Sequence, residues 1–111
     1  MNSEKLYHYL KQNHSGRKNA ALSKELEAVF LCKGSEIRKH INELRANTIP
    51  VCSSGLGYYY SENTDDIDET VAHLNSRISK IELARNGLLK VKNQILSRKE
   101  DHDGKKNRPD N

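Results

Sequence analysis

The sequence has no tryptophan, one phenylalanine and two prolines among its 111 residues. A hydrophobic core must therefore be built mainly from Leu, Ile, Val and Tyr, and it must be small because only 34% of the residues are hydrophobic. A domain of about 60 residues buries only about 60% of the surface that its unfolded chain exposes. The chain therefore has room for one folded unit with appendages, and a partner copy would help to stabilise it.

Long apolar runs and clusters of metal ligands are also missing. No apolar N-terminal segment and no run of 18 apolar residues is present, so we expect no membrane contact and a cytoplasmic protein with Cys32 and Cys52 reduced. The five histidines show no metal-ligand spacing, so we expect no metal and no cofactor. Without a glycine-rich phosphate loop, an HExxH motif or a nucleophile elbow, we expect no catalytic residue and no enzyme.

Three amphipathic patterns in residues 3–47 predict three short helices. The predicted starts are Ser3, Ser23 and Ser35, and Gly34 is expected to break the chain between the second helix and the third, at about 36–47. The apolar residues that recur at helical spacing are Leu6, Tyr9 and Leu10, then Leu26, Val29 and Phe30, then Ile37, Ile41 and Leu44.

The spacing then changes to the alternation typical of strands. Residues 49–53 and 58–60 are β-branched or aromatic runs joined by a glycine-bearing connection, which predicts a hairpin. Tyr58 and Tyr60 share one face and are expected in the core, whereas Tyr59 points the other way and is expected to be exposed. Three helices followed by a hairpin predict a winged helix-turn-helix domain over residues 1–62, in a mainly α protein with a small β-hairpin.

A long helix is predicted over Thr64–Arg98, within a segment 63–98 that we assign to dimerisation. Its apolar residues repeat on average every 3.5 residues, the coiled-coil period, with one local overwinding near Ala84. The expected dimerisation residues are Ile67, Val71, Leu74, Ile78, Ile81, Leu88, Val91 and Ile95. The remaining residues, 99–111, contain no apolar side chain and are expected to be disordered.

The charges of this helix are unevenly distributed. Residues 62–69 hold five acidic residues and no basic one, whereas 77–98 hold six basic residues against Glu82. This arrangement suits the helix dipole, and it also suits an antiparallel pair in which acidic and basic ends lie together. An antiparallel homodimer is therefore a hypothesis, and a parallel one stays open.

The N-terminal half resembles the winged-helix domain of biotin-repressor-type regulators and of small phage and prophage DNA-binding proteins. The resemblance covers residues 4–60 and lies in the segments Ala21-Leu22-Ser23-Lys24-Glu25-Leu26, GSEIRKHINELR at 34–45, Ile49-Pro50-Val51-Cys52 and Gly57-Tyr58-Tyr59-Tyr60. It implies that the third helix enters the major groove of double-stranded DNA and that the hairpin touches the adjacent backbone or minor groove. One departure is a hairpin tip, residues 53–57, that has no basic residue.

The residues expected to contact DNA come from three places. Residues 1–48 hold nine Lys or Arg and five Glu, a net charge of +4. Opposite the apolar stripe of the third helix lie side chains that suit base edges and phosphates. The full set is Ser35, Arg38, Lys39, Asn42 and Arg45 of the third helix, Arg17, Lys18 and Lys24 before it, and Ser54 of the hairpin.

Two classes of function follow from these patterns. The first is a dimeric, sequence-specific DNA-binding protein, acting as a transcriptional regulator or as a phage-type replication or recombination accessory factor. The second is a protein-interaction adaptor that uses the winged helix as a scaffold and the long helix to bind a partner.

Overall fold

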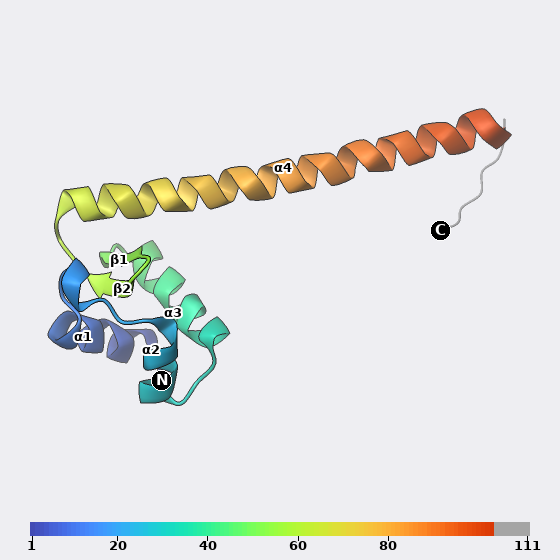
Figure 1. Cartoon of the computed structure of the whole chain (residues 1–111). Helices are drawn as coiled ribbons and strands as arrows, with labels where there is room; N and C mark the ends of the chain where they lie inside the picture. The colour runs from blue at the N-terminus through green and yellow to red at the C-terminus, as the bar shows by residue number, and fades with distance from the viewer. Residues whose placement is uncertain (104–111) are drawn as a thin grey trace. The chain divides into compact units, whose positions relative to one another are not determined.

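The computed structural model describes residues 1–103 and is mainly helical, with one small antiparallel hairpin and a long C-terminal helix (Figure 1). Residues Met1–His73 form one compact unit, and the rest of the last helix, from Leu74, forms a second. The elements are α1 (Ser3–Asn13), the 3-10 turn η1 (Arg17–Asn19), α2 (Ser23–Phe30), α3 (Gly34–Ala46), β1 (Val51–Ser54), β2 (Gly57–Tyr60) and α4 (Thr64–Asp103).

The three short helices occur where the sequence predicts them, but their first turns are capped by other residues. Asn2 caps α1 by accepting a hydrogen bond from the Lys5 backbone N–H at 2.8 Å, not Ser3 as predicted. The N-terminal flanking residue of α2 is Leu22, whose N–H donates to the Glu25 carboxylate at 2.9 Å. Gly34 is the first residue of α3 and not a break before it, because α2 already ends at Phe30 and its C-cap residue, Leu31, adopts a left-handed conformation.

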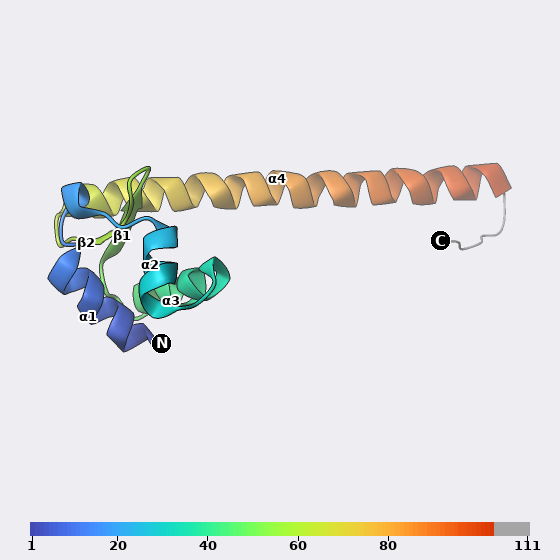
Figure 2. The same ribbon diagram turned by 60° about the horizontal axis from the view of Figure 1, so that its bottom comes forward.

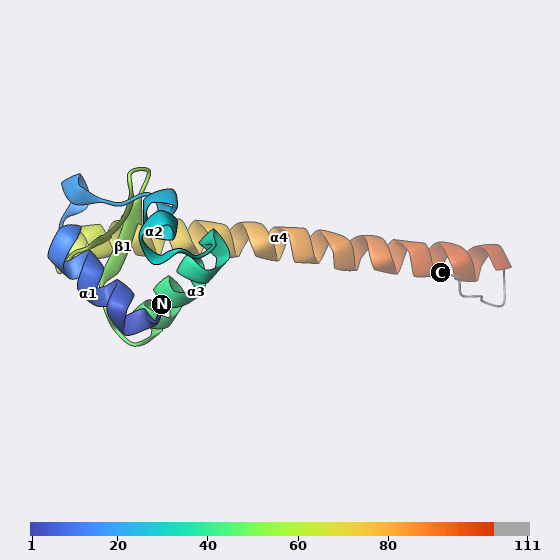
Figure 3. The ribbon, with the colours of Figure 1, turned by 90° about the horizontal axis from the view of Figure 1, so that it is seen from below.

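One apolar core joins α1, α2 and α3 to the first strand (Figure 2). The buried residues are Leu6, Leu10, Ala21, Leu26, Ile37, Ile41, Leu44 and Val51, which include most of the predicted stripes. Tyr9 and Phe30 extend this core with an edge-to-face contact at 5.3 Å between ring centroids. Figure 3 shows the start of α1 beside α3, where the Ser3 hydroxyl lies 2.9 Å from Nδ1 of His40.

The hairpin is covered on both faces. β1 and β2 pair with Val51 opposite Tyr60 and Cys52 opposite Tyr59, and the core described above packs against Val51 and Tyr58. On the other face Cys52 and Tyr59 are also buried. The prediction that Tyr59 is exposed is therefore wrong, because the first turns of α4 lie over that face.

Hydrogen bonds hold the first turns of α4 to the hairpin. Thr70 Oγ1 accepts from the Ser53 backbone N–H at 3.2 Å and donates to the Asp66 carbonyl at 2.9 Å. The Thr70 side chain is buried, although the rest of α4 beyond it is largely exposed. Residues 64–73 of α4 are therefore part of the N-terminal unit, which extends beyond the boundary at residue 62 that the sequence suggests.

The segment between α1 and α2 pairs with the free edge of β2. Ala21 and Tyr58 exchange two backbone hydrogen bonds of 2.8 Å, and Tyr60 bonds to the backbone of His14 and Gly16. Gly57, at φ +123°, lies against this segment so closely that a Cβ there would stand 2.2 Å from the Ala21 carbonyl oxygen. The hairpin is thereby fixed between the α1–α2 connection and α3.

The long helix continues further than predicted. Asn63 precedes it and its side chain accepts from the Asp65 N–H at 2.8 Å. The helix runs to Asp103, so residues 99–103, predicted as disordered, are helical, and residues 104–111 of that predicted tail lie outside the described residues. No helix in the described chain has an apolar stretch that could span a bilayer.

Candidate nucleic-acid interface

The outward face of α3 carries four polar side chains. Ser35, Arg38, Lys39 and Asn42 are all exposed, and they lie opposite the buried stripe of Ile37, Ile41 and Leu44. Within residues 1–103 their side chains make no hydrogen bond or salt bridge. The buried stripe fixes the helix, and the opposite face presents two cations, an amide and a hydroxyl to solvent.

The acidic residue beside this face is held toward α1. The Glu43 carboxylate accepts a hydrogen bond of 2.9 Å from the Ser3 hydroxyl, and its Oε1 lies 2.9 Å from Nδ1 of His40. The hydrogen bond from Ser3 is the main reason that the pKa of Glu43 lies below its usual value, and His40 adds to it. Glu43 is therefore directed toward α1, and the charge of Lys39 makes a smaller contribution to its lowered pKa.

Arg45 is used differently from its neighbours on α3. Its Nε donates to the Val51 carbonyl at 2.7 Å, and a terminal nitrogen donates to the Ser53 hydroxyl at 3.1 Å. The side chain is half-buried and joins α3 to β1. Sequence reasoning placed Arg45 among the DNA contacts, but the structure gives its guanidinium a bracing role in the fold.

This difference predicts opposite outcomes for one substitution made at two positions. Arg45→Met is expected to lower the free energy of unfolding by about 2 kcal/mol, because charge-assisted hydrogen bonds are lost and a backbone carbonyl loses its donor. Arg38→Met is the matched control, since Arg and Met have similar helix propensities and Arg38 makes no such bond. Urea unfolding of both variants at one protein concentration checks the difference, and equal stabilities would contradict the bracing role.

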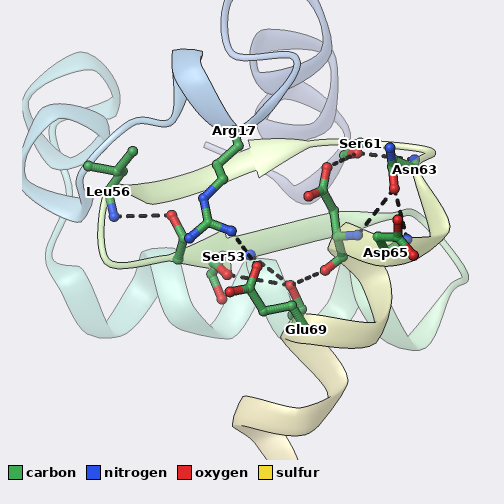
Figure 4. A network of polar contacts seen from close by, with 10 residues as sticks. Arg17, Ser53, Leu56, Ser61, Asn63, Asp65 and Glu69 are labelled. Atoms are coloured by element: carbon green, nitrogen blue, oxygen red, sulfur yellow. Dashed lines mark hydrogen bonds and ion pairs between the residues drawn. The ribbon is translucent and has the colours of Figure 1, made fainter.

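The basic residues that precede α3 likewise include one that is paired within the fold and two that are not. The Arg17 guanidinium pairs with the Glu69 carboxylate at the start of α4 (Figure 4), so its charge is compensated within the N-terminal unit. Lys18 and Lys24 are exposed and make no salt bridge within residues 1–103. Ser54 is half-buried, and its hydroxyl accepts from the Leu56 N–H at 3.1 Å. Of these predicted contacts, Lys18 and Lys24 present uncommitted cations.

The acidic start of α4 is occupied by contacts that its own fold requires. Asp66 accepts a 2.8 Å hydrogen bond from the Ser61 hydroxyl. Glu69 pairs with Arg17, as Figure 4 shows. Glu62 accepts a 2.6 Å hydrogen bond from Tyr60, which raises the pKa of that tyrosine to about 12. These three carboxylates are paired with Ser61, Arg17 and Tyr60 inside the N-terminal unit.

The acidic residues between 62 and 69 also lower the net charge of the N-terminal unit. Residues 1–73 hold nine Lys or Arg and ten Asp or Glu, a net charge of −1, although residues 1–48 alone carry +4. The five acids between 62 and 69 belong to the segment that covers the Tyr59 face of the hairpin, whereas α3 contributes to the core on the Val51 face. The unit is therefore close to neutral as a whole, with its uncompensated cations on α3 and before it.

The predicted dimerisation residues differ in exposure along α4. Ile67 and Leu74 are half-buried, whereas Val71, Ile78, Ile81, Leu88, Val91 and Ile95 are between 37% and 70% exposed. Three further leucines, Leu83, Leu89 and Leu96, are 72%, 51% and 51% exposed, and the sequence reading did not include them. From Ile78 onward the helix thus presents a long series of apolar residues that the described part of the chain leaves largely exposed.

No group of three or more His, Cys, Asp or Glu residues in the described part of the chain could hold a metal ion. Both cysteines are free thiols, and burial raises the pKa of the Cys52 thiol. In comparisons with known proteins, no family model, no curated protein and no solved structure matches this chain.

Proposed function

We propose that this chain is a DNA-binding protein of the winged helix-turn-helix type that works as a homodimer. The observation that carries the proposal is the face of α3, where Ser35, Arg38, Lys39 and Asn42 are exposed and have no hydrogen-bond partner among the described residues. Arg and Lys can bond to guanine edges, Asn can bond to adenine in two places, and Ser can hold a phosphate. The α-helix is also the element that fits the major groove.

The way α3 is held supports the same function. Its three buried residues lie in the common core, and Arg45 fixes its C-terminal end to β1. A recognition helix gains specificity when its side chains are presented by a rigid scaffold. In this proposal Lys18 and Lys24 contact phosphates beside the groove, while Arg17 and Arg45 shape the unit and do not read bases.

Salt dependence of binding tests this proposal. The full chain is expected to bind a random-sequence duplex with an affinity that falls steeply with salt, because each phosphate contact releases a condensed counterion. Three to four contacts per copy predict a slope of about −3 in log K against log salt for one bound unit. Fluorescence anisotropy between low and physiological salt measures it, and an absence of binding at low salt would contradict the proposal.

A protein-interaction adaptor is a second candidate, and one observation favours it. Leu22, Val29 and Leu31 are 52%, 49% and 90% exposed around α2, in a unit whose net charge is −1. Large apolar side chains left exposed on and beside a helix can contribute to a protein contact. An adaptor would bind a partner helix with little dependence on salt, so the same titration separates the two functions.

A further inference from the structure

The apolar stripe of α4 has a symmetry that neither its length nor its average period requires. Leu74, Ile78 and Ile81 precede the midpoint between Ala84 and Arg85 by the same numbers of residues as Ile95, Val91 and Leu88 follow it. The spacing of the stripe therefore reads the same in both directions along the helix. A two-fold antiparallel pair needs this property, because each layer of its seam takes one residue from either side of the axis.

We infer that a second copy of this chain covers this stripe, with the two α4 helices antiparallel and the two-fold axis between Ala84 and Arg85. The seam then consists of three apolar layers, each occurring twice. These layers are Leu74 with Ile95 of the other copy, Ile78 with Val91, and Ile81 with Leu88. The inference rests on the homodimer of the proposed function and does not depend on DNA binding.

The basic residues of α4 favour this antiparallel arrangement over a parallel one. A seven-residue repeat continued from Ile78 places Arg85 and Lys92 on the seam. In a parallel pair each of them would face its own counterpart, giving two layers of like charge in the interior, which is strongly unfavourable. A parallel pair in register therefore conflicts with the basic residues of this helix.

In the antiparallel register neither cation faces its own counterpart. With the axis between Ala84 and Arg85, Arg85 is level with Ala84 of the other copy and Lys92 is level with Arg77. Arg85 then lies beside Glu82 of the other copy, which is the acidic residue between 77 and 98, and Lys92 lies beside Asn75. The two-fold axis repeats this opposite-charge pair of Arg85 and Glu82 on the same edge of the seam.

Distances between spin labels test the orientation and the register together. Ser76 and Asn93 are exposed, lie on the side of the helix away from the stripe, and stand equally far from the proposed axis. Each is changed singly to cysteine in a full-length Cys32→Ser, Cys52→Ala background, whose sedimentation and thermal unfolding serve as controls. The two label pairs are expected at the same distance, about 25–30 Å, because 17 residues of helix separate the positions.

Other distances would overturn the inference in recognisable ways. A parallel pair in register would remove the separation along the helix axis, so both distances would fall to roughly 15–20 Å, the width across the outer faces of two packed helices. A register shifted by one residue would lengthen one distance and shorten the other by about 1.5 Å each, so that the two would differ by about 3 Å. A chain that sediments as a monomer removes the pairing altogether, and it leaves the salt-dependent DNA binding to be judged by its own titration.

A charge exchange gives an independent readout on the native cysteine background. Glu82→Arg and Arg85→Glu are each expected to raise the dissociation constant of the dimer about tenfold, since two pairs become repulsive in each variant. The double variant restores both pairs with reversed polarity and is expected to return near the wild-type value. A double variant as weak as the sum of the single effects would overturn the proposed register.

Discussion

Gly57→Ala is expected to lower the free energy of unfolding by roughly 3 kcal/mol or more, a large part of the stability of a small domain. The backbone at Gly57 has φ +123°, which is strained for any residue with a Cβ. The added carbon would also meet the Ala21 carbonyl at 2.2 Å, and that atom is backbone that cannot swing away. Two hydrogen bonds between Ala21 and Tyr58 would be displaced with it.

Gly55 provides the matched control two residues away. A Cβ at Gly55 would meet no atom within 4 Å, so Gly55→Ala in the same hairpin is expected to change stability by less than about 0.5 kcal/mol. Chemical unfolding followed by circular dichroism measures both variants at one concentration. If the two alanine variants are equally stable, the close contact between Gly57 and the α1–α2 connection is not a feature of the protein in solution.

Reversing the two cations of α3 is expected to have the largest effect on DNA binding. Arg38→Glu combined with Lys39→Glu should weaken binding at least about 100-fold, because two favourable contacts are lost and two carboxylates face the phosphates. The salt dependence should become shallower by about two counterions for the same reason. Stability should change little, since both side chains are exposed and make no salt bridge among the described residues.

A control with equal charge separates the α3 face from general electrostatics. Lys5→Glu combined with Lys11→Glu removes the same four charge units from α1, and both lysines are exposed. If long-range attraction alone brought the protein to DNA, the two double variants would bind equally weakly. Retained binding in the α1 variant and loss in the α3 variant would support α3 as the element that contacts DNA.

Much of the fold follows from local patterns that act over a few residues. The stripes at Leu6, Leu26 and Ile37 each define one buried helix face, and the switch to alternating residues after Ile49 defines the hairpin. The long helix is equally clear, because its apolar spacing continues without a proline. These signals are strong since each element must bury one face to be stable.

The errors arise where the structure depends on contacts between distant segments. The exposure predicted for Tyr59 assumed a hairpin with one free face, and no local pattern reveals that α4 folds back over it. Thr70 offered a faint signal, as a polar residue at helical spacing between Ile67 and Leu74. The roles of Arg17 and Arg45 were missed for the same reason, since Glu69 and Val51 become their neighbours only in three dimensions.

The first turns of α4 determine the shortest N-terminal fragment that can be expected to fold. A fragment that stops at residue 62 would leave Tyr59 and Cys52 facing water and would remove the partner of Arg17. Its failure to fold would say nothing about the three helices themselves. The shortest piece that keeps the fold intact therefore extends to about His73, where the compact N-terminal unit ends.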